Sequence, residues 1–175
     1  MDSDPNWPGR EAVILSKQMV EDKFNVTFSQ GLGRVYPPSG LLKSYQEALV
    51  AVAIPRLMGK KHFIQFFSDL GIFSAIFSHD KETIQEYCLQ TLGKIMEHDD
   101  KNDTELLNTL RVLLDNDCSW KTTADKLYVH VNTVHYRLSK IEKLLDIDFS
   151  VFDTRINLFT GIKSWDTLQV CGLMD

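Results

Sequence analysis

The segment Ser119–Leu138, SWKTTADKLYVHVNTVHYRL, constrains the fold of this chain more than any other stretch. It predicts two short helices joined by a tight turn, the first running from about Trp120 to Leu127 with Ser119 as its N-cap. Ala124 falls where the two helices would cross most closely, and a small side chain is needed there. The pattern therefore predicts a helix-turn-helix, whose second helix enters the DNA major groove.

The second helix of the pair is predicted to span about residues 131–144, with His130 or Asn132 as its cap. Val134, Leu138 and Ile141 have the spacing of a buried apolar stripe, which leaves polar side chains to face outward. The residues expected to contact DNA in these two helices are Lys121, Thr122, Thr123, His130, Asn132, Thr133, His135, Tyr136, Arg137 and Lys140.

These side chains suit different parts of a DNA duplex. Arg137 can bond guanine or a phosphate, Asn132 can read adenine, and Thr133 can contact a phosphate or a thymine methyl group. Lys121, with Thr122 and Thr123, is placed for backbone contacts that set register without reading sequence. Tyr128 occupies the turn position where many helix-turn-helices have glycine, and a bulky residue is tolerable there only if the turn keeps φ negative.

The overall composition is that of a globular chain, but its charge is unevenly distributed. Five cationic and two acidic residues give the segment Ser119–Leu145 a charge of +3, which leaves −8 for the rest of a chain whose net charge is −5. One basic face on an acidic body fits a regulator that touches phosphates with one part. No apolar run is long enough to span a membrane, the N-terminus MDSDPNWPGR lacks a signal-peptide core, and three scattered cysteines suggest a cytoplasmic protein.

The remaining sequence predicts a small mixed α/β part followed by helices. Asp103 is expected to cap a helix that begins at Thr104, and Asp153 to open or lie early in the last helix. The other predicted elements are helices at 11–24, 39–57 (capped by Ser39), 69–77 and 81–96, strands at 25–30 and 62–67, a turn at Gly31–Arg34, and an acidic linker at 97–103.

The run Ala124–Asp148, ADKLYVHVNTVHYRLSKIEKLLDID, closely resembles the C-terminal DNA-binding domain of PucR/CdaR-type bacterial transcriptional regulators. The helix Glu105–Leu110 and the pair Asp153 and Arg155 match that family too, and the helix pair is similar to the DNA-binding end of Fis-like proteins. The resemblance implies control of metabolic genes, often of purine or organic-acid catabolism. Two positions depart from the family, since Val131 and His135 stand where its members often carry Arg or Lys.

The N-terminal part is similar to the closing segment of the degenerate GGDEF-like domain that precedes this module in the family. Gly31-Leu32-Gly33-Arg34, Pro37, Leu41, Ser44-Tyr45 and Glu47-Ala48 carry that similarity. The family's upstream sensory region is missing, so we expect a fragment or a shortened member. We therefore expect a mainly α fold: a partial GGDEF-like α/β segment at 1–67, a helical connector at 68–102, and a C-terminal helical bundle with a Fis-like helix-turn-helix at 103–170.

Other chemistry is weakly supported. No Gly-Gly-Asp/Glu-Glu-Phe run is present to hold a nucleotide, Gly31-x-Gly33 is too short for a phosphate-binding fingerprint, and His130 and His135 are poorly spaced for a metal. Cys88, Trp120 and Trp165 are expected in the core. We expect no enzyme activity, no cofactor and no metal.

The sequence thus predicts a sequence-specific regulator that binds double-stranded DNA, as a homodimer on half-sites about 34 Å apart. Its effector and operator are left open. The alternative is a non-enzymatic dimerisation or small-ligand module, in which the aromatic segment His62–Phe77 forms a dimer face or an effector pocket instead of core.

Overall fold

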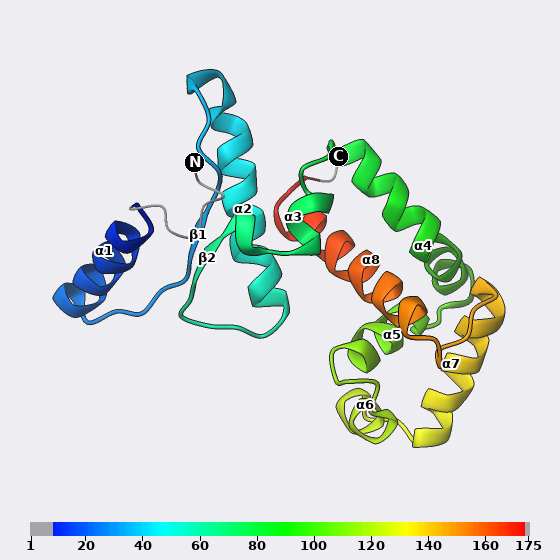
Figure 1. Ribbon diagram of the computed structural model, residues 1–175. Helices are drawn as coiled ribbons and strands as arrows, with labels where there is room; N and C mark the ends of the chain where they lie inside the picture. Colours follow the sequence, from blue (N-terminus) through cyan, green and yellow to red (C-terminus); the bar gives the residue numbers. More distant parts are fainter. Residues whose placement is uncertain (1–8, 174–175) are drawn as a thin grey trace. The chain divides into compact units, whose positions relative to one another are not determined.

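A computed structural model describes residues 9–173 and divides the chain into two compact units (Figure 1). Within the described residues, one unit contains the chain up to Lys81 together with the segment from Asp166 onward, and the other is Glu82–Trp165. The predicted mainly α fold is confirmed. The elements are α1 (Gly9–Phe24), β1 (Gln30–Leu32), α2 (Leu41–Leu57), β2 (Ile64–Phe66), α3 (Ile72–Ile76), α4 (Lys81–Asn102), α5 (Leu106–Leu114), α6 (Trp120–Leu127), α7 (Val131–Leu145) and α8 (Phe152–Val170).

In the first unit, β1 and β2 form a two-stranded parallel sheet that packs on α2. The strand predicted at 25–30 is misplaced, because β1 starts at Gln30 and runs through the segment expected to turn. The glycines explain the shift. A β-carbon on Gly31 would lie 2.3 Å from the carbonyl oxygen of Ala48, and one on Gly33 would lie 1.9 Å from that of Ser44. The two glycines allow the strand to lie directly against α2.

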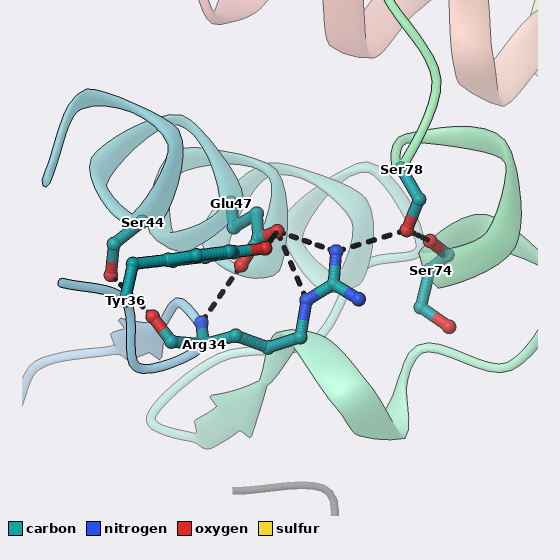
Figure 2. Close-up of polar contacts among 6 residues, drawn as sticks. All are labelled: Arg34, Tyr36, Ser44, Glu47, Ser74 and Ser78. Carbon is teal, nitrogen blue, oxygen red and sulfur yellow. Dashed lines mark hydrogen bonds and ion pairs between the residues drawn. The ribbon is translucent and has the colours of Figure 1, made fainter. Parts of the chain in front are cut away.

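A carboxylate inside the first unit fixes the chain after β1 (Figure 2). Glu47 of α2 is only 2% exposed and accepts hydrogen bonds from the Arg34 backbone N–H at 2.8 Å, Arg34 Nη2 at 2.6 Å and the Tyr36 hydroxyl at 2.6 Å. Arg34 Nη2 also donates to Ser78 Oγ at 3.0 Å. Burial raises the pKa of Glu47, but these hydrogen bonds outweigh it, and the pKa lies below its ordinary value.

One capping prediction for this unit needs correction. Ser39 does not cap α2, because Pro38–Gly40 form a 3-10 turn and Gly40 is the N-cap, without a side-chain hydrogen bond. The helix ends at Leu57 as predicted, with Pro55 in its last turn. Helix α1 also forms as predicted, but four of its apolar side chains are exposed: Ile14 43%, Leu15 58%, Met19 70% and Phe24 62%. Its buried side chain is Lys17, which pairs with Glu21.

The acidic segment predicted as a linker is helical, because α4 continues to Asn102. Asp99 explains why a polar stretch stays ordered here. Its carboxylate accepts from the backbone N–H groups of Leu106 and Leu107, both at 2.8 Å, and from Thr104 Oγ1 at 2.6 Å. Asp99 therefore satisfies the first turn of α5, which Asp103 was expected to cap. Asp103 instead takes a φ of 50°.

The core of the second unit includes the facing sides of α4 and α8. Cys88 is fully buried and lies 3.6 Å from the Gly161 carbonyl oxygen, so its predicted core position is confirmed. Trp165 is also buried, at 9% exposure, whereas Trp120 is 38% exposed and does not belong to the core. In the aromatic segment of the first unit, Phe67, Phe73 and Phe77 are buried, which favours core packing over an exposed dimer face.

Membrane-spanning helices and clusters of metal-binding side chains are the features that bear on function here. Over residues 9–173, no helix has both the length and the apolar character needed to cross a membrane. Over the same residues, no group of three or more His, Cys, Asp or Glu side chains is placed to hold a metal ion. The expectation about a signal peptide concerns the first ten residues, of which 1–8 lie outside the described part.

Candidate nucleic-acid interface

The helix-turn-helix forms where the sequence predicts it. Helix α6 starts after Ser119, whose hydroxyl oxygen accepts from the Thr122 backbone N–H at 3.4 Å. Helix α7 starts after His130, whose Nδ1 accepts from the Asn132 backbone N–H at 3.2 Å. Because Nδ1 is the acceptor, a neutral His130 ring carries its proton on Nε2 and presents that N–H as a donor.

The inner face of the pair is apolar and well buried. Val134 and Ile141 have no exposed surface and Leu138 is 3% exposed, so the predicted stripe of α7 is confirmed. Ala124, at 4% exposure, keeps α6 close to α7. The third helix of the bundle, α5, is in contact with both and contributes buried Leu106, Leu110 and Leu113. Burial on this side fixes which side of α7 faces away from the bundle.

The outer face of α7 is a continuous exposed stripe, called the α7 stripe below. Its members recur at the i, i+3, i+4, i+7 and i+11 positions of one helical face. The α7 stripe consists of Asn132, His135, Tyr136, Ser139 and Lys143. It offers an amide, an imidazole, a phenol, a hydroxyl and an ammonium group, which can donate hydrogen bonds to base edges or phosphates.

The predicted contact residues fall into three groups by exposure. Lys121, His130, Asn132, His135 and Tyr136 are exposed. Thr122, Thr133, Arg137 and Lys140 are half-buried, and Thr123 is fully buried. Ser139 and Lys143, which were not among the predicted contact residues, are exposed on the same helical face as Asn132.

Thr123 must be removed from the predicted contact set. Its side chain has no exposed surface, and its hydroxyl donates to the Ser119 carbonyl oxygen at 2.8 Å. A polar side chain can be buried in this way because the carbonyl four residues earlier satisfies its hydroxyl. Thr123 therefore belongs to the packed side of α6.

Arg137 does not face outward as predicted, because its guanidinium is bonded to α5. Nη1 donates to Thr109 Oγ1 at 2.9 Å, and Nη2 lies 3.1 Å from a Glu105 carboxylate oxygen. The Arg137 side chain is 18% exposed, and Thr109 is fully buried. The arrangement joins α7 to α5 and turns this guanidinium away from the α7 stripe.

One aromatic side chain contacts α7, and a second lies in the turn before it. The Trp120 ring meets His135 edge to face, with ring centroids 3.5 Å apart. Tyr128 lies in the turn with a φ of 55°, so the condition of a negative φ is not met. Its backbone ends α6 in the left-handed conformation that glycine adopts more readily, and its side chain is 96% exposed.

Comparison with known protein families agrees with this geometry. Residues 106–163 match the family model described as the PucR C-terminal helix-turn-helix domain. The chain contains a PucR C-terminal helix-turn-helix domain. The matched region of this PucR domain begins at the first residue of α5 and takes in α6, α7 and the first part of α8.

The matches to curated relatives cover more of this chain than the PucR domain. The chain is 35% identical to the "Proline-responsive transcriptional activator PutR" of Bacillus subtilis (strain 168), over 69% of this chain and 30% of the relative. It is 28% identical to the "Purine catabolism regulatory protein" of the same organism, over 90% and 31%. It is 23% identical to the "Carbohydrate diacid regulator" of Escherichia coli (strain K12), over 78% and 35%. The chain thus spans about a third of the length of these relatives. No solved structure gives a significant match.

Proposed function

We propose that this chain is a sequence-specific DNA-binding regulator of metabolic genes that inserts the N-terminal half of α7 into the major groove. The observation that carries the proposal is the α7 stripe, which is exposed on the helix whose opposite face is fully packed. The PucR domain match and the names of the relatives, which respond to proline or regulate purine catabolism, support the same function. Nothing in the named relatives points to an enzyme.

Each part of the interface has a separate role in this proposal. Asn132, in the first turn of α7, reads a base edge, and the backbone N–H groups of that turn favour a nearby phosphate. Lys121 and Lys143 are exposed cations that bind the backbone without reading sequence. Arg137 holds α7 at the angle these contacts require.

Binding as a homodimer is part of the proposal. Two PucR domains about 34 Å apart would read two half-sites one helical turn apart. We further propose that the first unit, with its strand, helix and parallel sheet, derives from a GGDEF-like domain. Three of the residues that resemble such a domain, Arg34, Ser44 and Glu47, belong to the hydrogen-bond network of Figure 2.

The test is selection of bound fragments from a genomic DNA library, followed by affinity measurements on a selected fragment. Asn132→Ala is expected to weaken specific binding by about 1–3 kcal/mol and to leave binding to unrelated DNA nearly unchanged. Gln90→Ala is the matched control, because it removes an exposed amide from α4, outside the proposed interface. If the wild type selects no fragment at low salt, DNA binding is wrong and the interaction-module alternative gains support.

A further inference from the structure

Tyr128 is held in a conformation that does not suit it and that its side chain does nothing to stabilise. Its φ is 55°, and 96% of the residue is exposed. Most of the described residues other than glycine with positive φ are Asn or Asp, which tolerate this region best: Asn25, Asp103, Asp117 and Asp146. A β-carbon in the left-handed conformation crowds the backbone. Glycine at this position would meet the needs of the turn better than tyrosine does.

The contacts of the turn come from its backbone. The Tyr128 N–H donates to the Asp125 carbonyl oxygen at 3.3 Å, and the Val129 N–H donates to that of Ala124 at 3.1 Å. Any residue that accepts a positive φ can make the first of these bonds. Within residues 9–173, the Tyr128 phenol has no recorded hydrogen bond or ring contact. Contacts within the described part of the chain therefore do not explain why a phenol stands at this position.

The place of Tyr128 suggests what the phenol contacts. It lies two residues before His130, the N-cap of α7, and two residues of chain span at most about 7 Å. The N-terminal turn of α7 is the part proposed to enter the major groove, which is about 12 Å wide and bordered by phosphates. In the proposed docking, with the α7 stripe facing the bases, a tyrosine next to that turn is close enough to reach the border of the groove.

We propose that Tyr128 contacts the DNA backbone, its hydroxyl donating a hydrogen bond to a phosphate oxygen at the edge of the groove. This inference rests on the proposed function. The contact fixes the depth and register of α7 and carries no sequence information, as is usual for phosphate contacts. The backbone strain at Tyr128 is retained because it aims the side chain at the duplex.

The experiment uses the full chain, a genomic fragment selected by the wild type, and an unrelated duplex of equal length. Tyr128→Gly and Tyr128→Phe are each expected to bind both DNAs about tenfold more weakly, since each loses one hydrogen bond to a charged group. Tyr128→Gly is also expected to unfold at the wild-type Tm or up to about 4 °C above it, because the strain is relieved. Tyr45→Phe is the control, since Tyr45 is 59% exposed on α2 of the first unit.

Each alternative outcome contradicts a different part of the proposal. Wild-type affinity in Tyr128→Gly, with Asn132→Ala impaired, removes Tyr128 from the interface and leaves the proposed function intact. Wild-type affinity in Tyr128→Phe alone overturns the hydrogen bond from the hydroxyl. A lower Tm for Tyr128→Gly shows that the ring supports the fold after all. If the wild type does not bind DNA, the proposed function itself is wrong.

Discussion

Replacing Arg137 with alanine distinguishes a positioning residue from a base reader. The guanidinium joins α7 to α5 through Thr109 Oγ1 at 2.9 Å and Glu105 at 3.1 Å. A base reader projects into solvent in the free protein, and its removal leaves the fold unchanged. A residue that bridges two helices of the bundle supports the fold, so its removal lowers the free energy of unfolding.

The structure sets the size of this effect. A hydrogen bond between a charged donor and the hydroxyl of fully buried Thr109 contributes about 1.5–3 kcal/mol. The Glu105 side chain is 61% exposed, so its ion pair adds less than about 1 kcal/mol. We therefore expect Arg137→Ala to cost about 2–3 kcal/mol. For a chain of this size, that cost lowers Tm by about 4–12 °C.

Thermal unfolding followed by circular dichroism, with urea midpoints, measures this cost. Glu105→Gln is the matched control, because it removes the exposed ion pair, and it should cost less than about 1 kcal/mol. Asn132→Ala should unfold as the wild type does, since that side chain is exposed. A double-mutant cycle of Arg137→Ala with Glu105→Gln isolates the ion pair from the Thr109 hydrogen bond.

One result would refute the positioning role. If Arg137→Ala unfolds within about 0.5 kcal/mol of the wild type and still loses specific DNA binding, Arg137 acts on DNA directly. Its guanidinium would then have to leave Thr109 when DNA binds. Loss of stability together with an equal loss of affinity on all DNAs agrees with positioning.

Two further predictions concern the first unit. Gly31→Ala should cost about 1–3 kcal/mol, measured by urea unfolding, because its β-carbon would meet backbone atoms of α2; Gly93→Ala in α4, where a β-carbon meets nothing within 4 Å, should be neutral or stabilising. The lowered pKa of Glu47 predicts that its stabilisation is complete above its ordinary pKa of 4.5 and is lost as pH falls through the folded value. The urea midpoints of wild type and Glu47→Gln should therefore converge as the pH falls below that ordinary value, and a constant gap would contradict the assignment.

Local signals in the sequence were sufficient for the helix-turn-helix. A serine before Trp120 and a histidine before Val131 are caps that act within a few residues of the helix they start. The stripe of Val134, Leu138 and Ile141 needs only the helical repeat. For this reason the bounds of α6 and α7 were predicted to within one residue.

Two other predictions were wrong because the local structure depends on interactions between distant segments. The strand after residue 25 was placed by alternation of apolar residues, but β1 is set by contact with α2, which only Gly31 and Gly33 permit. The segment 97–103 looked like a linker because it is acidic. Asp99 makes it part of a helix by satisfying backbone N–H groups of Leu106 and Leu107 in the next element.

Two residues of the predicted DNA-contact set, Thr123 and Arg137, do not face outward as expected. Arg137 was placed outward because it is not a member of the apolar stripe of α7. Thr123 was placed there because it lies near the start of α6. Neither argument considers polar residues that flank a buried stripe and pack on a neighbouring helix. Arg137 follows buried Val134 by three residues and precedes buried Leu138, so it borders the packed side of α7. Ser139 and Lys143 share the face of Asn132 at i+7 and i+11, and both are exposed. A polar residue that lies three or four positions from two members of the buried stripe, as Arg137 lies from Val134 and Ile141, is therefore expected to border the packed side of the helix.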